Sequence, residues 1–170
     1  MKVIGMVLTL ISTTSIGYLM AMKFRARRWI IKSFITALNI LKIEITYSRT
    51  PLERAFKKVA SSSDKLVSEL FYKASFYLGE QIGLTAAEAW EKGLKEWDRG
   101  YLTKEDKEIL IAFGNSLGSS DVENQEKNFN MTLDLLKRQL DFAEEEGRRN
   151  EKLYNNLGFL LGLAIVILFL

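Results

Sequence analysis

Two long uncharged stretches lie at the ends of the chain. The first extends from Val3 to Met22 and the second from Leu153 to Leu170. As helices, these runs of 20 and 18 residues would be about 30 Å and about 27 Å long, close to the thickness of the hydrocarbon core of a bilayer. The pattern therefore predicts a transmembrane anchor at each end.

Basic residues flank both runs on their inner sides: Lys23, Arg25, Arg27 and Arg28 follow the first, and Arg148, Arg149 and Lys152 precede the second. A cleaved signal peptide would instead carry its positive charge before the apolar stretch. Because flanking cations stay in the cytoplasm, we expect residues 23–152 to be cytoplasmic and both termini to lie outside. The seven cations are also expected to face anionic lipid, which explains the first cluster better than nucleic-acid binding does.

Small residues recur at four-residue spacing in both runs. Gly5 and Gly17 belong to this pattern in the first run, and Gly158 and Gly162 form a Gly-x-x-x-Gly motif in the second. Such spacing allows two helix backbones to approach closely. A helix–helix contact within one chain and a contact between two chains both fit the pattern.

The residues between the two runs carry many helix signals. They include one proline and neither Asn-Gly nor Asp-Gly, so hairpins are poorly supported. Apolar spacing predicts helices over about 27–47 and 64–81, further helices that open near Thr50, Thr85 and Thr103, and a last helix that runs from about Asp121 into the terminal run. We therefore expect an all-α fold, with an anchor over 1–22, a six-helix antiparallel bundle over 23–152 and an anchor over 153–170.

Local motifs sharpen the expected helix ends. Three segments have the spacing of a capping box, and they begin at Thr50, Thr85 and Ser120. Gly118 is suited to the left-handed conformation that ends a helix. A heptad seam marks the last helix at Phe129, Leu133, Leu136, Leu140, Ala143 and Gly147. Beside it, Glu144 with Arg148 and Glu145 with Arg149 have the spacing of ion pairs along one helix.

The amino-acid composition limits the kinds of catalytic and metal sites that the chain can form. The 170 residues include no cysteine and no histidine, and the net charge is +3, so zinc sites and imidazole-activated nucleophiles are excluded. An acidic group at Glu105, Asp106 and Glu108 remains, but acids in a first helical turn stabilise the helix dipole. There is no Walker-type glycine loop. We therefore expect a protein that is not an enzyme and that holds no cofactor or metal.

Three short segments, in their order and spacing, carry a family resemblance. They are Leu84 to Trp90, Leu117 to Asp121, and Asn150 to Gly158. Together with the length and both anchors, they resemble the stage III sporulation protein AB family over the whole chain. The motif residues Thr85, Glu88, Trp90, Leu117, Gly118, Ser120 and Asp121 are candidate partner contacts, although capping and core packing explain most of them.

The resemblance implies a bundle like the cytoplasmic domain of the inner-membrane platform proteins of type II secretion and type IV pilus machines. It also implies a non-enzymatic, multi-pass platform in the mother-cell or outer forespore membrane, within the channel complex that endospore formation requires. Its expected partners are a secretion-type ATPase, other channel membrane proteins and the lipid bilayer, and not nucleic acid. Platform proteins carry two such bundles and this chain has room for one, so a duplicated docking surface would require a homo-oligomer.

Two alternatives remain open at this point. One is a single-bundle platform of a pilus or secretion machine in a bacterium that makes no spores, and pilin genes beside its gene would favour it. The other, less favoured, is a membrane-bound enzyme that uses the carboxylates between Glu105 and Glu108 with an oxygen-ligated metal.

Overall fold

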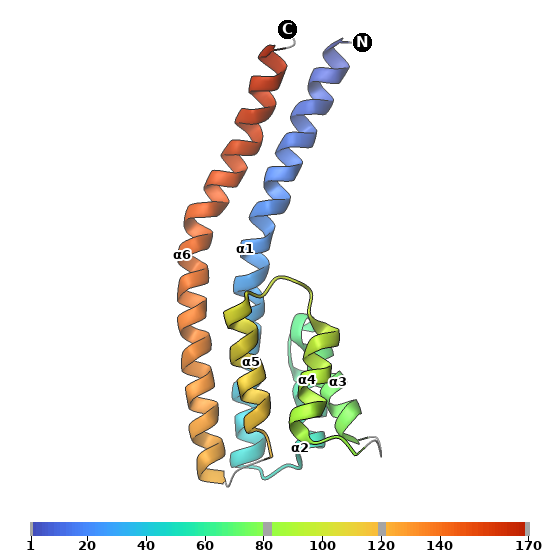
Figure 1. Ribbon diagram of the computed structural model, residues 1–170, viewed down its shortest axis with the longest axis vertical. Helices are drawn as coiled ribbons and strands as arrows, with labels where there is room; N and C mark the ends of the chain where they lie inside the picture. The colour runs from blue at the N-terminus through green and yellow to red at the C-terminus, as the bar shows by residue number, and fades with distance from the viewer. Residues whose placement is uncertain (1, 80–82, 119–121, 169–170) are drawn as a thin grey trace. The chain divides into compact units, whose positions relative to one another are not determined.

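The described residues of this computed structural model are 2–79, 83–118 and 122–168, and they contain helices but no strand. The helices are α1 (Lys2–Thr46), α2 (Leu52–Ser62), α3 (Lys65–Gly79), α4 (Ala86–Trp97), α5 (Lys104–Ser116) and α6 (Val122–Leu168) (Figure 1). The all-α prediction is confirmed, and the helices of the middle region begin and end within a few residues of the expected positions.

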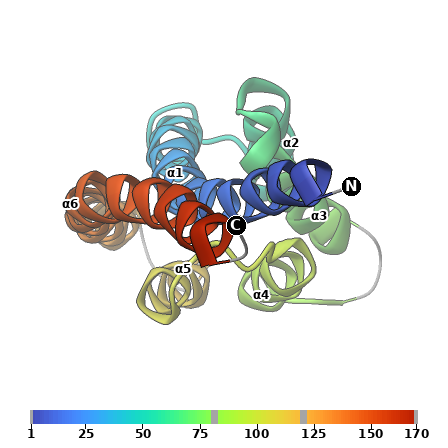
Figure 2. The same cartoon turned by 90° about the horizontal axis from the view of Figure 1, so that it is seen from above.

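The chain forms two compact units. One consists of Trp29–Leu140, and the other of Met1–Arg28 together with Asp141–Leu170. In the first unit the helices follow one another round a common core in chain order (Figure 2). The ring closes between its first and last members, because Lys42 Nζ on α1 lies 3.0 Å from Glu126 Oε1 on α6.

An aromatic cluster fills the centre of this bundle. Each of the six helices contributes a buried ring, and α4 contributes two; the rings are Phe34, Phe56, Phe71, Trp90, Trp97, Phe113 and Phe129. Trp90 lies among three of them, with ring centroids 5.8 Å from Phe56, 5.4 Å from Phe71 and 5.3 Å from Phe113. Pairs at these distances favour edge-to-face or offset packing and add to the free energy gained by burying apolar area. The core therefore fixes the positions of all six helices.

Each of the two long helices includes one of the terminal apolar runs. The predicted anchor over 3–22 and the predicted helix over 27–47 form one continuous helix, α1. The last helix runs without a break into the terminal apolar run, as predicted. Within the described chain, length and composition identify one helix able to cross a membrane, over Val7–Thr46 with a mean hydropathy of 1.3. A C-terminal span is not identified in this way, so the second anchor stays a prediction.

The helix caps confirm some predictions and correct one. Thr85 forms the predicted capping box with Glu88, and Gly118 has the expected left-handed conformation at φ +75°. The box at Thr50 is wrong, because its hydroxyl donates a 2.9 Å hydrogen bond to Glu44 Oε2 and leaves α2 without a side-chain cap. The box predicted at Ser120 includes Asp121, and both residues lie outside the described ones.

Candidate functional site

Helices α4 and α5 are antiparallel neighbours, and Trp90 on α4 contacts α5 through a hydrogen bond and through packing. Its Nε1 donates a 2.8 Å hydrogen bond to the carbonyl oxygen of Leu110. The indole also occupies the space in which a side chain at position 114 would lie, because a Cβ on Gly114 would overlap Trp90 Cδ1. The family-motif residue Trp90 is therefore a buried core contact, and its side chain is closed to a partner.

Two of the three motif segments, Leu84 to Trp90 and the described part of the second, Leu117 and Gly118, meet at one end of this helix pair. Thr85 caps α4, and its backbone N–H donates to Glu88 Oε2 at 2.7 Å. At the end of α5, Leu117 is buried, and a Cβ on Gly118 would lie 3.4 Å from Ala86 Cβ. These two segments therefore form one junction, where the start of α4 packs on the end of α5.

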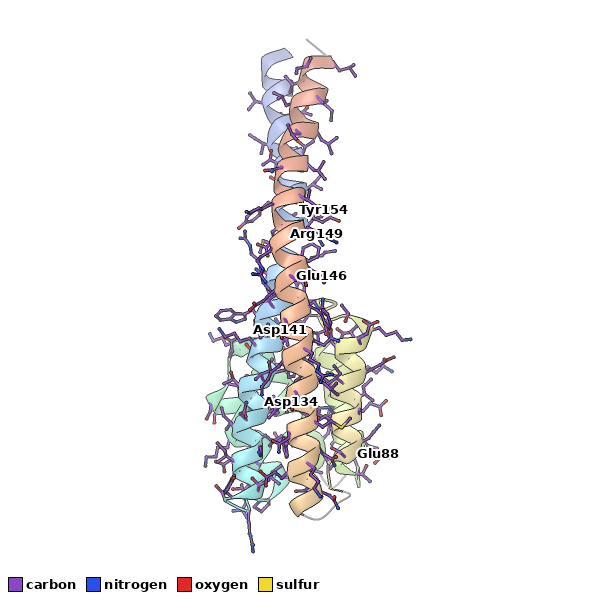
Figure 3. All side chains as sticks on the ribbon, turned by 90° about the vertical axis from the view of Figure 1, so that its left-hand side faces the viewer. Glu88, Asp134, Asp141, Glu146, Arg149 and Tyr154 are labelled. Atoms are coloured by element: carbon purple, nitrogen blue, oxygen red, sulfur yellow. The ribbon has the colours of Figure 1, made fainter. Side chains whose placement is uncertain are left out.

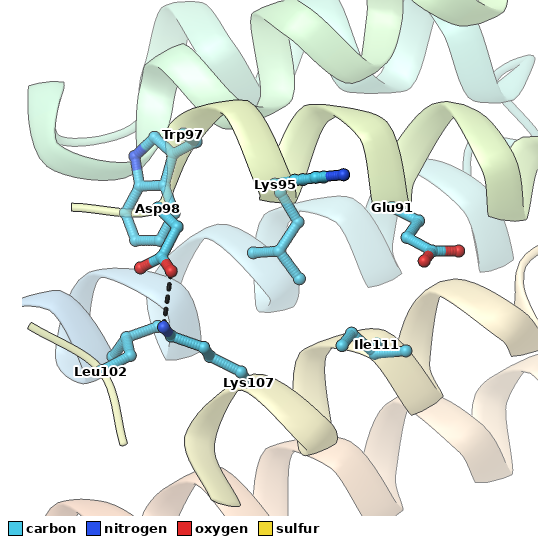
Figure 4. Close-up of a pocket in the computed structure, with 8 residues that line it drawn as sticks. Glu91, Lys95, Trp97, Asp98, Leu102, Lys107 and Ile111 are labelled. Carbon is cyan, nitrogen blue, oxygen red and sulfur yellow. Dashed lines mark hydrogen bonds and ion pairs between the residues drawn. The ribbon is translucent and has the colours of Figure 1, made fainter. Parts of the chain in front are cut away.

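A groove of about 350 Å³ lies between the same two helices. Its lining residues are Glu91, Leu94, Lys95, Trp97, Asp98, Leu102, Lys107 and Ile111 (Figure 4). Leu94, Trp97 and Leu102 are buried, whereas the side chain of Ile111 is 37% exposed. The groove thus offers an apolar interior with one accessible aliphatic wall.

Charged side chains surround this groove. Lys107 Nζ pairs with Asp98 Oδ2 across the space between α4 and α5. Partial burial acts to raise the pKa of Asp98, but hydrogen bonds from Lys107 and from the backbone N–H of Gly100 outweigh it and hold that pKa below its ordinary value. Asp98 is therefore ionised at neutral pH. Glu91 and Lys95, one turn apart on α4, make no ion pair within the described chain and can meet a partner of either charge.

The acidic group at the start of α5 has structural partners. Asp106 is fully buried and forms a capping box with Thr103. Hydrogen bonds from its own backbone N–H and from the Thr103 hydroxyl lower the pKa of Glu105, and Glu108 Oε1 lies 3.6 Å from Lys104 Nζ. Among the residues that the structure describes, no group of three or more acidic, histidine or cysteine side chains could hold a metal ion. These acids therefore stabilise a helix start.

The unit of Met1–Arg28 and Asp141–Leu170 is held together by ion pairs between its two helices. Arg27 Nη1 lies 2.7 Å from Glu146 Oε2. Glu151 forms ion pairs with two arginines: Arg25 Nε lies 2.9 Å from its Oε2, and Arg28 Nη2 lies 2.6 Å from its Oε1. Hydrogen bonding to Glu151 and the attraction of its charge raise the pKa of Arg25. Three of the basic residues expected to face lipid therefore bind the neighbouring helix, and the Arg27 side chain is 9% exposed.

These pairs were missed from the sequence, although a signal for them was present. Glu146 and Glu151 flank the predicted seam in the g and e positions, which commonly pair across helices. The four-residue spacing along a single helix predicted ion pairs of Glu144 with Arg148 and of Glu145 with Arg149 instead. Neither of those pairs forms among the described residues, so the expected ion pairing within α6 is wrong.

Small residues lie where these two helices approach each other. Gly17 on α1 and Gly162 on α6 are buried, and so is Ala21, which continues the four-residue spacing from Gly17. Gly5 is exposed, with open space where its Cβ would be. The small residues at 17, 21 and 162 therefore belong to a contact within one chain. The burial of Gly158 lies outside what the structure describes.

Aromatic and apolar residues extend this unit beyond its charged part. Phe24 and Tyr154 stack with ring centroids 5.9 Å apart. Large apolar side chains farther along both helices are exposed, among them Val7, Leu8, Ile11, Ile16, Leu19, Leu157, Leu160, Leu161, Ile167 and Leu168. Exposed apolar area of this extent is unfavourable in water and is typical of a surface that contacts lipid or protein.

The comparisons with known proteins agree with one another. A family model described as stage III sporulation protein AB matches residues 2–170. The stage III sporulation protein AB of Bacillus subtilis (strain 168) is 36% identical over 169 residues, which cover 99% of this chain and 98% of that protein. A solved structure of a stage III sporulation protein AB matches with a TM-score of 0.67 and 34% identity, over 72% of this chain and 96% of that one. The chain therefore belongs to the stage III sporulation protein AB family.

Proposed function

We propose that this chain is a non-enzymatic membrane platform of the channel complex between mother cell and forespore, with the bundle in the cytoplasm and both termini outside. Membership of the family over residues 2–170 supports a role in sporulation. That match carries the proposal, because it separates this chain from platform proteins of bacteria that make no spores.

Exposed apolar side chains support the proposed pair of membrane spans. In α1, Leu8, Ile11 and Leu19 are more than half exposed, and in α6, Leu160 and Leu161 are too. Transfer of such surface from water to hydrocarbon is favourable by about 25 cal/mol per Å². The basic flanks at Lys23 and Lys152 support a cytoplasmic bundle between the two spans.

The groove between α4 and α5 is the docking face that we propose for a secretion-type ATPase. It combines an accessible aliphatic side chain, Ile111, with buried apolar neighbours. At its charged rim, Glu91 and Lys95 make no ion pair within the described chain and are available to a partner. A protein interface with an apolar centre and a polar rim has this composition. The groove is formed by the same two helices as the junction of the two motif segments but lies toward the opposite end of the pair.

Capture of the ATPase by the full-length chain in detergent tests this docking face. Ile111→Glu places a charge on the accessible wall of the groove and should abolish capture, because the carboxylate would lose its hydration on binding. Met131→Glu is the matched control, since Met131 is 65% exposed on α6, and it should bind as the unaltered chain does.

Circular dichroism of both variants shows whether each remains folded. Equal capture by the two folded variants would contradict the proposed face. Failure of the unaltered chain to capture the ATPase, together with normal sporulation of a deletion strain, would contradict the proposed function as a whole.

A further inference from the structure

We propose that Lys23, Arg148, Arg149 and Lys152 form a binding surface for the headgroups of anionic phospholipids. The proposal rests on the membrane insertion proposed above. It names a ligand class for one part of the unit and assigns this role to only four of the seven flanking cations.

The first supporting observation is that the two segments 23–28 and 147–152 contain no unpaired carboxylate. Glu151 is the one acidic residue within 23–28 and 147–152. Its side chain is 15% exposed and lies between Arg25 and Arg28. Two guanidinium groups thus neutralise the single carboxylate of these two segments, and the exposed acids Glu144 and Glu145 lie before them on α6.

The second observation is that the four named cations remain available. All four are exposed, and none makes an ion pair with another described residue. Arg148 and Lys152 are one turn apart on α6, Arg149 is turned about 100° from Arg148 on the same helix, and Lys23 is on α1. The cations therefore point to more than one side of the helix pair, as expected for contact with several lipid molecules.

The third observation is the order of charge along α6. Exposed acids at Asp141, Glu144 and Glu145 come first, the cations follow, and apolar side chains come last. Figure 3 shows Asp141, Glu146, Arg149 and Tyr154 in that order along the helix. Positive charge thus directly adjoins the exposed apolar side chains of Leu153 and Leu157.

This order favours phospholipid over a small free anion. A phospholipid has an anionic headgroup joined to an acyl chain, and it can contact the cations and the adjoining apolar side chains together. Inorganic phosphate has no apolar part and would gain nothing from Leu153 or Leu157. Arginine binds phosphate oxygens through two parallel hydrogen bonds, and each cation near an anionic membrane surface increases binding about fivefold.

The test uses the full chain reconstituted into bilayers of phosphatidylcholine with a minor fraction of phosphatidylglycerol. Spin-labelled forms of the two lipids report how strongly each associates with the protein. The unaltered chain should prefer phosphatidylglycerol several-fold, and a variant with Arg148→Gln, Arg149→Gln and Lys152→Gln should lose most of that preference. The matched control carries Lys65→Gln, Lys104→Gln and Lys137→Gln, which remove the same charge from the bundle, and should keep it.

Two further measurements identify the ligand and the cause of a failure. Inorganic phosphate should reduce the preference no more than chloride does at equal ionic strength, and selective competition by phosphate would overturn the assignment to lipid. Extraction at alkaline pH first shows whether the chain is integral to the bilayer. An integral chain without a lipid preference, or with equal loss in both variants, overturns this inference alone, whereas a chain that is not integral contradicts the proposed function.

Discussion

Arg27 Nη1 and Glu146 Oε2 lie 2.7 Å apart, although 119 residues separate them in the sequence. Arg27 is the more buried partner, since its side chain is 9% exposed and that of Glu146 is 51% exposed. The pair joins α1 to α6 in the unit of Met1–Arg28 and Asp141–Leu170. Removal of the carboxylate would leave a buried guanidinium without this partner.

Glu146→Gln should therefore lower the free energy of unfolding of the full chain in detergent. We expect a loss of about 1 kcal/mol, because solvent reaches one side of the pair and screens it. Thermal unfolding measures this loss. Glu144→Gln is the control, since Glu144 is exposed and makes no ion pair with a described residue, and an equal effect of both substitutions would contradict a specific role for Glu146.

Gly17 and Gly5 should respond differently to the same substitution. Gly17 is buried between the two helices of its unit, whereas a side chain at Gly5 would enter open space. Gly17→Leu should therefore force α1 and α6 apart and lower the unfolding temperature in detergent. Gly5→Leu should have little effect, and equal sensitivity at the two positions would contradict the contact within one chain.

Gly114→Ala should destabilise the bundle even though alanine favours a helix by up to about 1 kcal/mol over glycine. The added methyl would overlap the indole of Trp90. That ring is held by three phenylalanine neighbours and by its hydrogen bond to Leu110, so relief of the overlap must disturb the core at a cost of about 1–3 kcal/mol.

Asn115→Ala is the control, because Asn115 is exposed on the same helix and its substitution changes helix propensity without an overlap in the core. Thermal unfolding of the two variants therefore distinguishes the effect of the overlap from that of helix propensity. The asparagine variant should equal or exceed the stability of the unaltered chain. A stabilising effect of Gly114→Ala would show that Trp90 is not fixed as described.

Glu88 should make stability depend on pH. Hydrogen bonds from the backbone N–H and then the hydroxyl of Thr85 lower the pKa of this carboxyl below its ordinary value of 4.5. The ionised form is thus favoured in the folded state. Its contribution is complete above pH 4.5 and is lost as pH falls through the lowered folded-state pKa.

Glu88→Gln should accordingly be less stable than the unaltered chain at neutral pH, and the difference should vanish in strong acid. Unfolding measured across the acid range checks this expectation. The same substitution in a Thr85→Ala background should give a smaller difference, and a difference that stays constant with pH would contradict the capping role of the charge.

The helices could be predicted from the sequence because each has local signals of its own. Thr85 with Glu88 and the glycine at 118 set helix ends through neighbouring atoms alone. Thr50 has the same spacing, yet its hydroxyl bonds to Glu44 on a different helix. The prediction failed there because a contact formed by the fold competes with the local cap.

The candidate site was harder to predict because its parts come from different helices. Resemblance selected the residues around Thr85 and Leu117, but only packing shows that these segments meet. The groove that the same two helices form, with Ile111 as its accessible wall, lies toward their other ends. The flanking cations fall into two groups for a similar reason. Arg27 and Arg149 both flank an apolar run in the sequence, but within the described chain only Arg27 pairs with an acid on the neighbouring helix, Glu146.

The orientation of the chain in the membrane tests the proposed platform most directly, and the absence of cysteine makes this measurement clean. Single substitutions Lys2→Cys, Ser61→Cys and Leu170→Cys place one thiol before the first apolar run, between the two runs, and at the outer end of the second run. A maleimide that cannot cross membranes should label positions 2 and 170 in intact cells, and position 61 only after the membrane is opened. Labelling of position 61 in intact cells, or protection of either terminal position, would contradict a cytoplasmic bundle between two spans.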